Sequence, residues 1–89
     1  MSFRYRLASQ PERYIRLLAP ELQRQVIDRI HVICENPRDR AVAEPLAGRN
    51  DGLHRARRGN LRILFYVDDD VQVVEVSYIG PRGDAYKGR

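Results

Sequence analysis

The stretch that decides the fold is residues 52–78, GLHRARRGNLRILFYVDDDVQVVEVSY. β-Branched and aromatic residues dominate this stretch, and two short segments, Gly59-Asn60 and residues 68–70, supply the glycine, asparagine and aspartates typical of turns. The pattern predicts three consecutive strands joined by two tight turns. An antiparallel meander is the simplest arrangement of such strands.

Four arginines fall within eight residues of this stretch: Arg55, Arg57, Arg58 and Arg62. Alternation along the first strand places Leu53, Arg55 and Arg57 on one face and His54, Ala56 and Arg58 on the other. Neighbouring guanidinium groups repel one another and are costly to remove from water. The cluster therefore favours a surface that meets a polyanion. The alternative interpretation is a solvated sheet face whose long charged side chains serve solubility.

The composition predicts one domain that spans residues 1–89. A chain of this length can bury one small core without disulfides or metals. Sixteen lysines and arginines stand against twelve acidic residues, and all but one of those cations are arginine. Arginine binds phosphate through two parallel hydrogen bonds, so the bias suits RNA or DNA contacts. A GC-rich coding sequence would produce the same bias.

Cysteine usage and apolar runs indicate a soluble, cytoplasmic protein. Cys34, the single cysteine, cannot form an internal disulfide, and it falls among the apolar positions of a predicted helix. The N-terminus has no signal-peptide core, and no run is long enough to span a membrane. Neither His31 nor His54 has a partner at metal-ligand spacing, so we expect no metal and no other cofactor.

A short strand and a helix precede the meander. Residues 2–8 alternate between apolar and basic side chains, which predicts a half-buried strand that pairs with the meander. Ser9 is the expected N-cap of a first helix, because a proline and a glutamate follow it at the spacing of a capping box. This helix should end near Ala19.

A second helix and a loop complete the order β-α-α-β-β-β, which is an α+β fold. Pro20 opens this helix, an apolar stripe from Leu22 to Cys34 faces the sheet, and Asn36-Pro37 ends it. A very short connection makes the two helices an antiparallel hairpin. Residues 37–52 form a loop, with Leu46 as its expected anchor in the core.

Taken together, these segments resemble the RelE/ParE superfamily of toxins from bacterial and archaeal type II toxin–antitoxin systems, and its RelE-like branch in particular. The most specific part of the resemblance is the spacing Arg55-x-Arg57-x-Gly59-x-x-Arg62, followed by Gly80-x-Arg82 and Tyr86. The resemblance implies a curved, antiparallel four-stranded sheet packed against a two-helix hairpin, the RelE-like microbial RNase fold.

The resemblance also implies an activity. RelE-like members enter the ribosomal A site and cut mRNA there, without a metal, by driving the 2′-hydroxyl onto the adjacent phosphate. The chain would then be a metal-independent endoribonuclease that inhibits translation. Its partners would be the 30S A site, mRNA and a cognate RelB-like antitoxin, with no membrane involved.

Matched position by position, the resemblance assigns roles to individual residues. The expected catalytic residues are Arg57, Arg62, Arg82 and Tyr86, and the expected RNA-binding residues are His54, Arg55, Arg57 and Arg58. Arg62 would hold the scissile phosphate and Arg82 would act at the leaving group. Tyr86 would stack on or activate the nucleotide, although it could instead pack the chain end onto the sheet.

Two departures from the family pattern affect the proton-transfer steps. Arg55 and Arg57 stand where RelE has lysines, and arginine, with a pKa above ~12, is a good phosphate clamp but a poor general base. Pro81 stands where many relatives carry a histidine. Proton transfer would fall to Tyr86, to a carboxylate such as Asp84, or to the ribosome.

Two other functions fit the same fold. A ParE-like protein would poison DNA gyrase by binding it, without nuclease chemistry. An inactive relative would bind only RNA or an antitoxin. The coincidence of the arginine cluster with a late tyrosine favours the RelE-like function.

Overall fold

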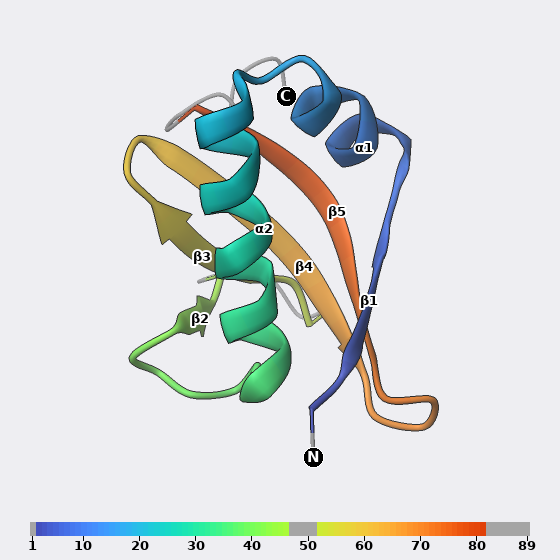
Figure 1. Cartoon of the computed structure of the whole chain (residues 1–89). Helices are drawn as coiled ribbons and strands as arrows, with labels where there is room; N and C mark the ends of the chain where they lie inside the picture. The colour runs from blue at the N-terminus through green and yellow to red at the C-terminus, as the bar shows by residue number, and fades with distance from the viewer. Residues whose placement is uncertain (1, 47–51, 82–89) are drawn as a thin grey trace.

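The computed structural model describes residues 2–46 and 52–81. Its elements, in chain order, are β1 (Arg4–Leu7), α1 (Ser9–Arg16), α2 (Pro20–Glu35), β2 (Ala43–Pro45), β3 (His54–Arg58), β4 (Leu61–Asp68) and β5 (Val73–Pro81). Both helices lie on the same side of one sheet, as Figure 1 shows. The α+β class and the helical hairpin are confirmed. Within the described ranges, the opposite face of the sheet carries no helix.

The sheet differs from the expected four-stranded antiparallel sheet in two details. It has five strands in the order β1-β5-β4-β3-β2, and β1 runs parallel to β5. The predicted meander is present, because β4 pairs antiparallel with β3 on one edge and with β5 on the other. The outer edge of β5 is therefore the edge of the meander at which β1 adds.

The parallel direction of β1 follows from the helical hairpin. The Phe3 N–H donates to the Cys34 carbonyl at 2.8 Å, so the end of α2 lies beside the beginning of β1. After α2 the chain is therefore back at the end of the sheet where β1 begins. The two turns of the meander then leave β5 running in the same direction as β3 and β1 (Figure 1).

The additional strand, β2, lies in the segment that the sequence analysis treated as a loop. Ala43, Glu44 and Pro45 pair antiparallel with Ala56, Arg55 and His54, respectively. Proline lacks an N–H and is tolerated in a strand only at an edge, and β2 is the edge strand of this sheet. Three residues that include a proline are too short a pattern to predict a strand.

Helix α1 begins and ends differently from the prediction. Ser9 is its first residue, not its N-cap; Ala8 holds the N-cap position, and no side chain caps the helix there. The helix ends at Arg16 instead of near Ala19. Leu17, the residue after the helix, is 86% exposed.

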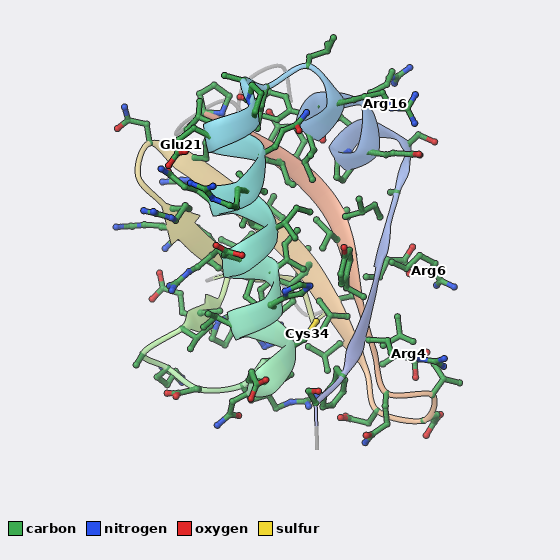
Figure 2. All side chains as sticks on the ribbon, viewed as in Figure 1. Arg4, Arg6, Arg16, Glu21 and Cys34 are labelled. Atoms are coloured by element: carbon green, nitrogen blue, oxygen red, sulfur yellow. The ribbon has the colours of Figure 1, made fainter. Side chains whose placement is uncertain are left out.

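Helix α2 supplies most of the core on the helical face. Its buried residues are Val26, Ile30, Ile33 and Cys34. They pack with Ile15 of α1 against buried sheet residues that include Ile63, Phe65, Val74, Val76 and Ile79. Burial raises the pKa of the Cys34 thiol, with a smaller contribution from the charge of Glu35. Cys34 is therefore a core residue, as expected, and Figure 2 shows its sulfur between α2 and the sheet.

The two ends of α2 differ in how well the prediction fits. The helix begins at Pro20 and ends just before Asn36, as predicted. Leu22, the first member of the predicted stripe, is exposed. The helices in the described ranges are too short and too polar to span a membrane.

A β-bulge determines which side chains of β5 face which way. Leu64 is opposite Tyr78, but Phe65 is opposite Val76, so Ser77 is an extra residue in β5. The Ser77 hydroxyl donates to the Leu64 carbonyl at 3.3 Å. Because of this bulge, a simple alternation of inward and outward side chains does not hold along the whole of β5.

Gln10 fastens α1 to β5 at the point where β1 has ended. The pairing of β1 stops at Leu7 with Val76, so the outer edge of Ile79 has no strand beside it. The Gln10 amide takes the place of a strand: its Nε2 donates to the Ile79 carbonyl at 2.8 Å, and its Oε1 accepts from the Ile79 N–H at 3.0 Å. Ile79 is completely buried, so both backbone groups would otherwise lack a partner away from water.

Replacing Gln10 with alanine should lower the free energy of unfolding by about 2 kcal/mol, because two buried backbone groups of Ile79 lose their partners. Urea denaturation of the purified chain measures this loss. Gln25→Ala is the matched control, since the Gln25 amide makes only a 3.4 Å hydrogen bond to Glu21 on its own helix. Equal losses in the two variants would contradict the fastening role of Gln10.

Candidate functional site

The alternation along β3 and β4 separates the core from a second surface. Ala56, Ile63 and Phe65 face the helices and belong to the main core. The residues between them face the opposite way, and the register pairs Arg55 with Leu64 and Arg57 with Arg62. We call this second surface, which carries no helix in the described ranges, the open face of the sheet.

Three of the expected site arginines share the open face. Arg55 and Arg57 follow each other along it on β3, and Arg62 lies directly opposite Arg57 on β4. Like charges directly opposite each other on neighbouring strands destabilise a sheet. The pairing therefore has a cost that a bound anion would reduce.

Arg62 is the only charged side chain that is buried in the described part of the chain, with 7% of its surface exposed. It lies between two apolar neighbours of β4, Leu61 and Ile63, which turn toward the helices. Arginine remains protonated under all physiological conditions. A buried guanidinium therefore brings a fixed positive charge into a partly desolvated environment, where its interaction with a phosphate is stronger than in water.

Arg55 is partly neutralised by an acidic neighbour. It forms an ion pair with Glu44 of β2, which lies opposite it in the register. The hydrogen bond from Arg55 and the charge of Arg55 hold the pKa of Glu44 below its ordinary value, with weaker contributions from Arg57 and Arg40. Glu44 thus carries a negative charge at neutral pH and balances one of the three arginines.

The structure places His54 and Arg58 on the helical face, away from these arginines. His54 stacks on Phe65 with a centroid separation of 5.4 Å and an interplanar angle of 18°. Its Nδ1 lies 2.8 Å from the Gly52 carbonyl and donates to it. Arg58 lies opposite Leu61, which packs against the main core. Neither side chain joins Arg55, Arg57 and Arg62 on the open face.

Two other expected site residues, Arg82 and Tyr86, lie outside the described residues, as does Asp84. Strand β5 ends at Pro81, which lies opposite Leu61. In the described ranges, no three histidines, cysteines, aspartates or glutamates gather as a metal site would require.

An aromatic and aliphatic cluster borders the arginines on the open face. Its buried members are Leu46, Leu53 and Leu64, and the rings of Tyr66 and Tyr78 pack against them. Leu46 thus anchors the preceding loop as expected, but into this second cluster and not into the main core. Half-buried tyrosines beside arginines can stack on nucleobases while the guanidiniums hold phosphates.

The ring of Tyr78 lies over a glycine of β5 that is opposite Arg62. Gly80 lies opposite Arg62, and a Cβ at position 80 would fall 2.3 Å from the Tyr78 hydroxyl oxygen and 2.7 Å from its Cζ. The hydroxyl end of the Tyr78 ring therefore covers Gly80, the residue that lies opposite Arg62. Tyr78 could not be identified from the sequence alone, because the bulge at Ser77 determines that Tyr78 faces the open side.

The model of the family described as the ParE toxin of type II toxin–antitoxin systems, parDE, matches residues 6–86. The toxin RelE of Mycobacterium tuberculosis is 37% identical over 46 residues, a match that spans 52% of this chain and 47% of the relative. The chain therefore aligns with about half the length of that relative.

Solved structures share the fold. A chain of the RelBE2 toxin–antitoxin complex from Mycobacterium tuberculosis has a TM-score of 0.77 and 25% identity, covering 92% of this chain and 100% of that one. A chain of the RelE–RelB complex from Pyrococcus horikoshii has a TM-score of 0.73 and 23% identity, covering 94% and 99%. The isolated RelE toxin of E. coli has a TM-score of 0.77 and 20% identity, covering 96% and 92%.

Gly80→Ala should displace the Tyr78 ring and lower the free energy of unfolding by about 1 kcal/mol, at the low end for overpacking because the tyrosine can swing away. Urea denaturation measures the loss. In a Tyr78→Ala background the same substitution should cost much less, since no ring then covers position 80. An equal loss in both backgrounds would show that the glycine is needed for another reason.

Proposed function

Because the chain belongs to the family of ParE toxins of type II toxin–antitoxin systems, we propose that it is a RelE-like toxin that cleaves mRNA on the ribosome. One observation carries the proposal: Arg57 and the buried Arg62 oppose each other on the open face. Two neighbouring guanidiniums, one of them buried, suit the binding of a single phosphate, which RNA cleavage requires and gyrase binding does not.

The proposed chemistry is attack of the ribose 2′-oxygen on the adjacent phosphorus. The new 2′-O–P bond forms as the P–O5′ bond breaks, which leaves a 2′,3′-cyclic phosphate and a 5′-hydroxyl. The pentacoordinate transition state gathers negative charge on the non-bridging oxygens. Arg57 and Arg62 would stabilise this charge from opposite strands, without moving at the moment of reaction.

Proton transfer requires groups other than these arginines. An arginine stays protonated at neutral pH, so it can donate hydrogen bonds to the phosphate but cannot take the 2′-hydroxyl proton. Tyr86 and Asp84 are the proposed candidates within the chain, and the ribosome is the alternative source. Arg82 is the proposed donor at the departing 5′-oxygen.

The proposed partners follow from the family and from the charge of the site. Two of the similar structures are toxin–antitoxin complexes, so we propose a RelB-like antitoxin that masks the open face. When the toxin is free, the 30S A site and its mRNA codon are the proposed targets. The location would be the cytoplasm, where ribosomes and mRNA meet.

The second candidate function is inhibition of DNA gyrase without nuclease activity. The family model that matches the chain takes its name from ParE toxins, and ParE-like members act on gyrase. On this alternative the open-face arginines would serve only to bind a partner, and transcripts would stay intact.

Arg62→Ala should abolish growth inhibition when the chain is induced in a bacterial host, because the scissile phosphate loses its buried cation. Mapping of 5′ ends shortly after induction should show cuts in translated regions, in reading-frame register, for the wild-type chain only. Arg62→Lys should restore a small part of the activity, since an ammonium keeps the charge but lacks the two-pronged geometry.

Arg16→Ala is the control, because this exposed arginine lies on α1 and pairs with Glu12 at 2.8 Å. It should remain fully toxic. Circular dichroism of each purified variant separates loss of activity from loss of folding. A folded Arg62→Ala chain that still arrests growth would refute the site, and intact mRNA with induced DNA damage would favour the gyrase alternative.

A further inference from the structure

A recess of about 330 Å³ opens at the edge of the sheet, between α2 and strands β2 and β3. Four arginines and a single glutamate supply all the charged side chains of its lining: Arg29, Arg40, Arg55, Arg57 and Glu44. The helix, the loop before β2 and β3 each contribute at least one of these arginines. The recess is therefore basic because three separate elements bring arginines together in the fold, and not because one segment of the sequence is highly charged.

The positive charge of the recess is only partly balanced. Glu44 is already engaged by Arg55, so it offers little compensation to the other arginines. The Arg29 Nη2 donates to the Val42 carbonyl at 3.3 Å, while its Nε is buried and has no hydrogen-bond partner among the described residues. The Arg29 guanidinium is therefore held in place at the recess, and its charge, together with those of the other arginines, suits an anion.

Arg57 connects this recess to the candidate site. On the open face it lies opposite Arg62, and at the sheet edge it lines the recess together with Arg29 and Arg40. Arg57 also lines an adjoining hollow of about 360 Å³, together with Arg58, Arg29 and one carboxylate, that of Asp28. A chain of phosphates could therefore run from Arg62 across Arg57 to Arg29 while remaining beside a cation.

We propose that the recess binds a backbone phosphate of the RNA strand next to the one held by Arg62, so that the strand bends around the β3 edge. This inference rests on the proposed ribonuclease function and adds Arg29 and Arg40 to the substrate-binding residues. Arg29 would contribute a guanidinium charge held in place by its hydrogen bond to the Val42 carbonyl, whereas the exposed Arg40 would approach the phosphate from the loop.

The first test measures the affinity of the full chain for a single-stranded oligonucleotide of roughly 12 nucleotides. Its riboses carry 2′-O-methyl groups, so it lacks the 2′-hydroxyl nucleophile and cannot be cleaved. The dependence of the binding constant on salt concentration counts the phosphates that the protein contacts. Arg40→Gln should weaken binding several-fold and reduce the log–log salt slope by about 0.7, the value for one phosphate of a single strand. Arg29→Gln should act in the same direction.

The second test uses Glu44→Gln, which should strengthen binding of the same oligonucleotide because Arg55 is then released to the RNA. Glu12→Gln and Arg16→Gln are charge-matched controls, since these residues form an exposed ion pair on α1, far from the recess. Figure 2 shows Arg16 projecting from α1 at the opposite end of the molecule from β2. Neither control should change the affinity by more than a small fraction of the effects at Arg40 and Glu44.

The outcomes separate the recess from the proposed function. If Arg62→Ala weakens RNA binding and abolishes cleavage while the Arg40 and Glu44 variants behave like the controls, the recess proposal is wrong and the function stands. If the wild-type chain shows no RNA binding and no cleavage on ribosomes, both fail. Inorganic phosphate that binds with the same dependence on Arg40, while the oligonucleotide does not, would reassign the recess to a small anion.

Discussion

The packing of the helices on one face of β4 is the constraint on which the rest of the structure depends. Ile63 and Phe65 are completely buried beneath the helices. A strand has a period of two, so their intervening neighbours Arg62, Leu64 and Tyr66 must face the other way. One hydrophobic interaction therefore fixes both the core and the position of the buried arginine. A shift of one residue in register would exchange the two faces, which is why the core protects the site geometry.

The open face shows how a small domain tolerates an arginine in a central strand. Leu46, Leu53 and Leu64, with the two tyrosines, form a second apolar cluster beside Arg62. Leu64 of this cluster is the next residue after Arg62 on the same face of β4, while Gly80 leaves room on the neighbouring strand for the Tyr78 ring. The arrangement fixes the position of the guanidinium, and a fixed cation needs little reorganisation when charge develops on a bound phosphate.

Local patterns in the sequence predicted the elements that depend on a single segment. The meander, the arginines on alternate positions of β3, and the apolar stripe of α2 all follow from periodicity. The features that were missed depend on contacts between distant segments. Gln10 fastens to Ile79 across almost the whole chain, β2 is too short to give a pattern, and the orientation of Tyr78 depends on the bulge at Ser77.

Charge divides the open face into two ends, and this division bears on how an RNA strand could lie there. Arg62 is the second residue of β4, and Asp68 is the last. Asp68, Asp69, Asp70 and Glu75, together with Arg6, line a third hollow of about 420 Å³. Six residue steps along the strand separate Arg62 from Asp68, a distance of about 20 Å. This distance exceeds the screening length of about 8 Å at physiological ionic strength. Each end therefore acts on a polyanion independently: the basic end attracts the phosphates, and the acidic end repels them. A strand that enters along β4 would be excluded from the acidic hairpin, so the favourable direction of departure from Arg62 is across β3 toward the sheet edge.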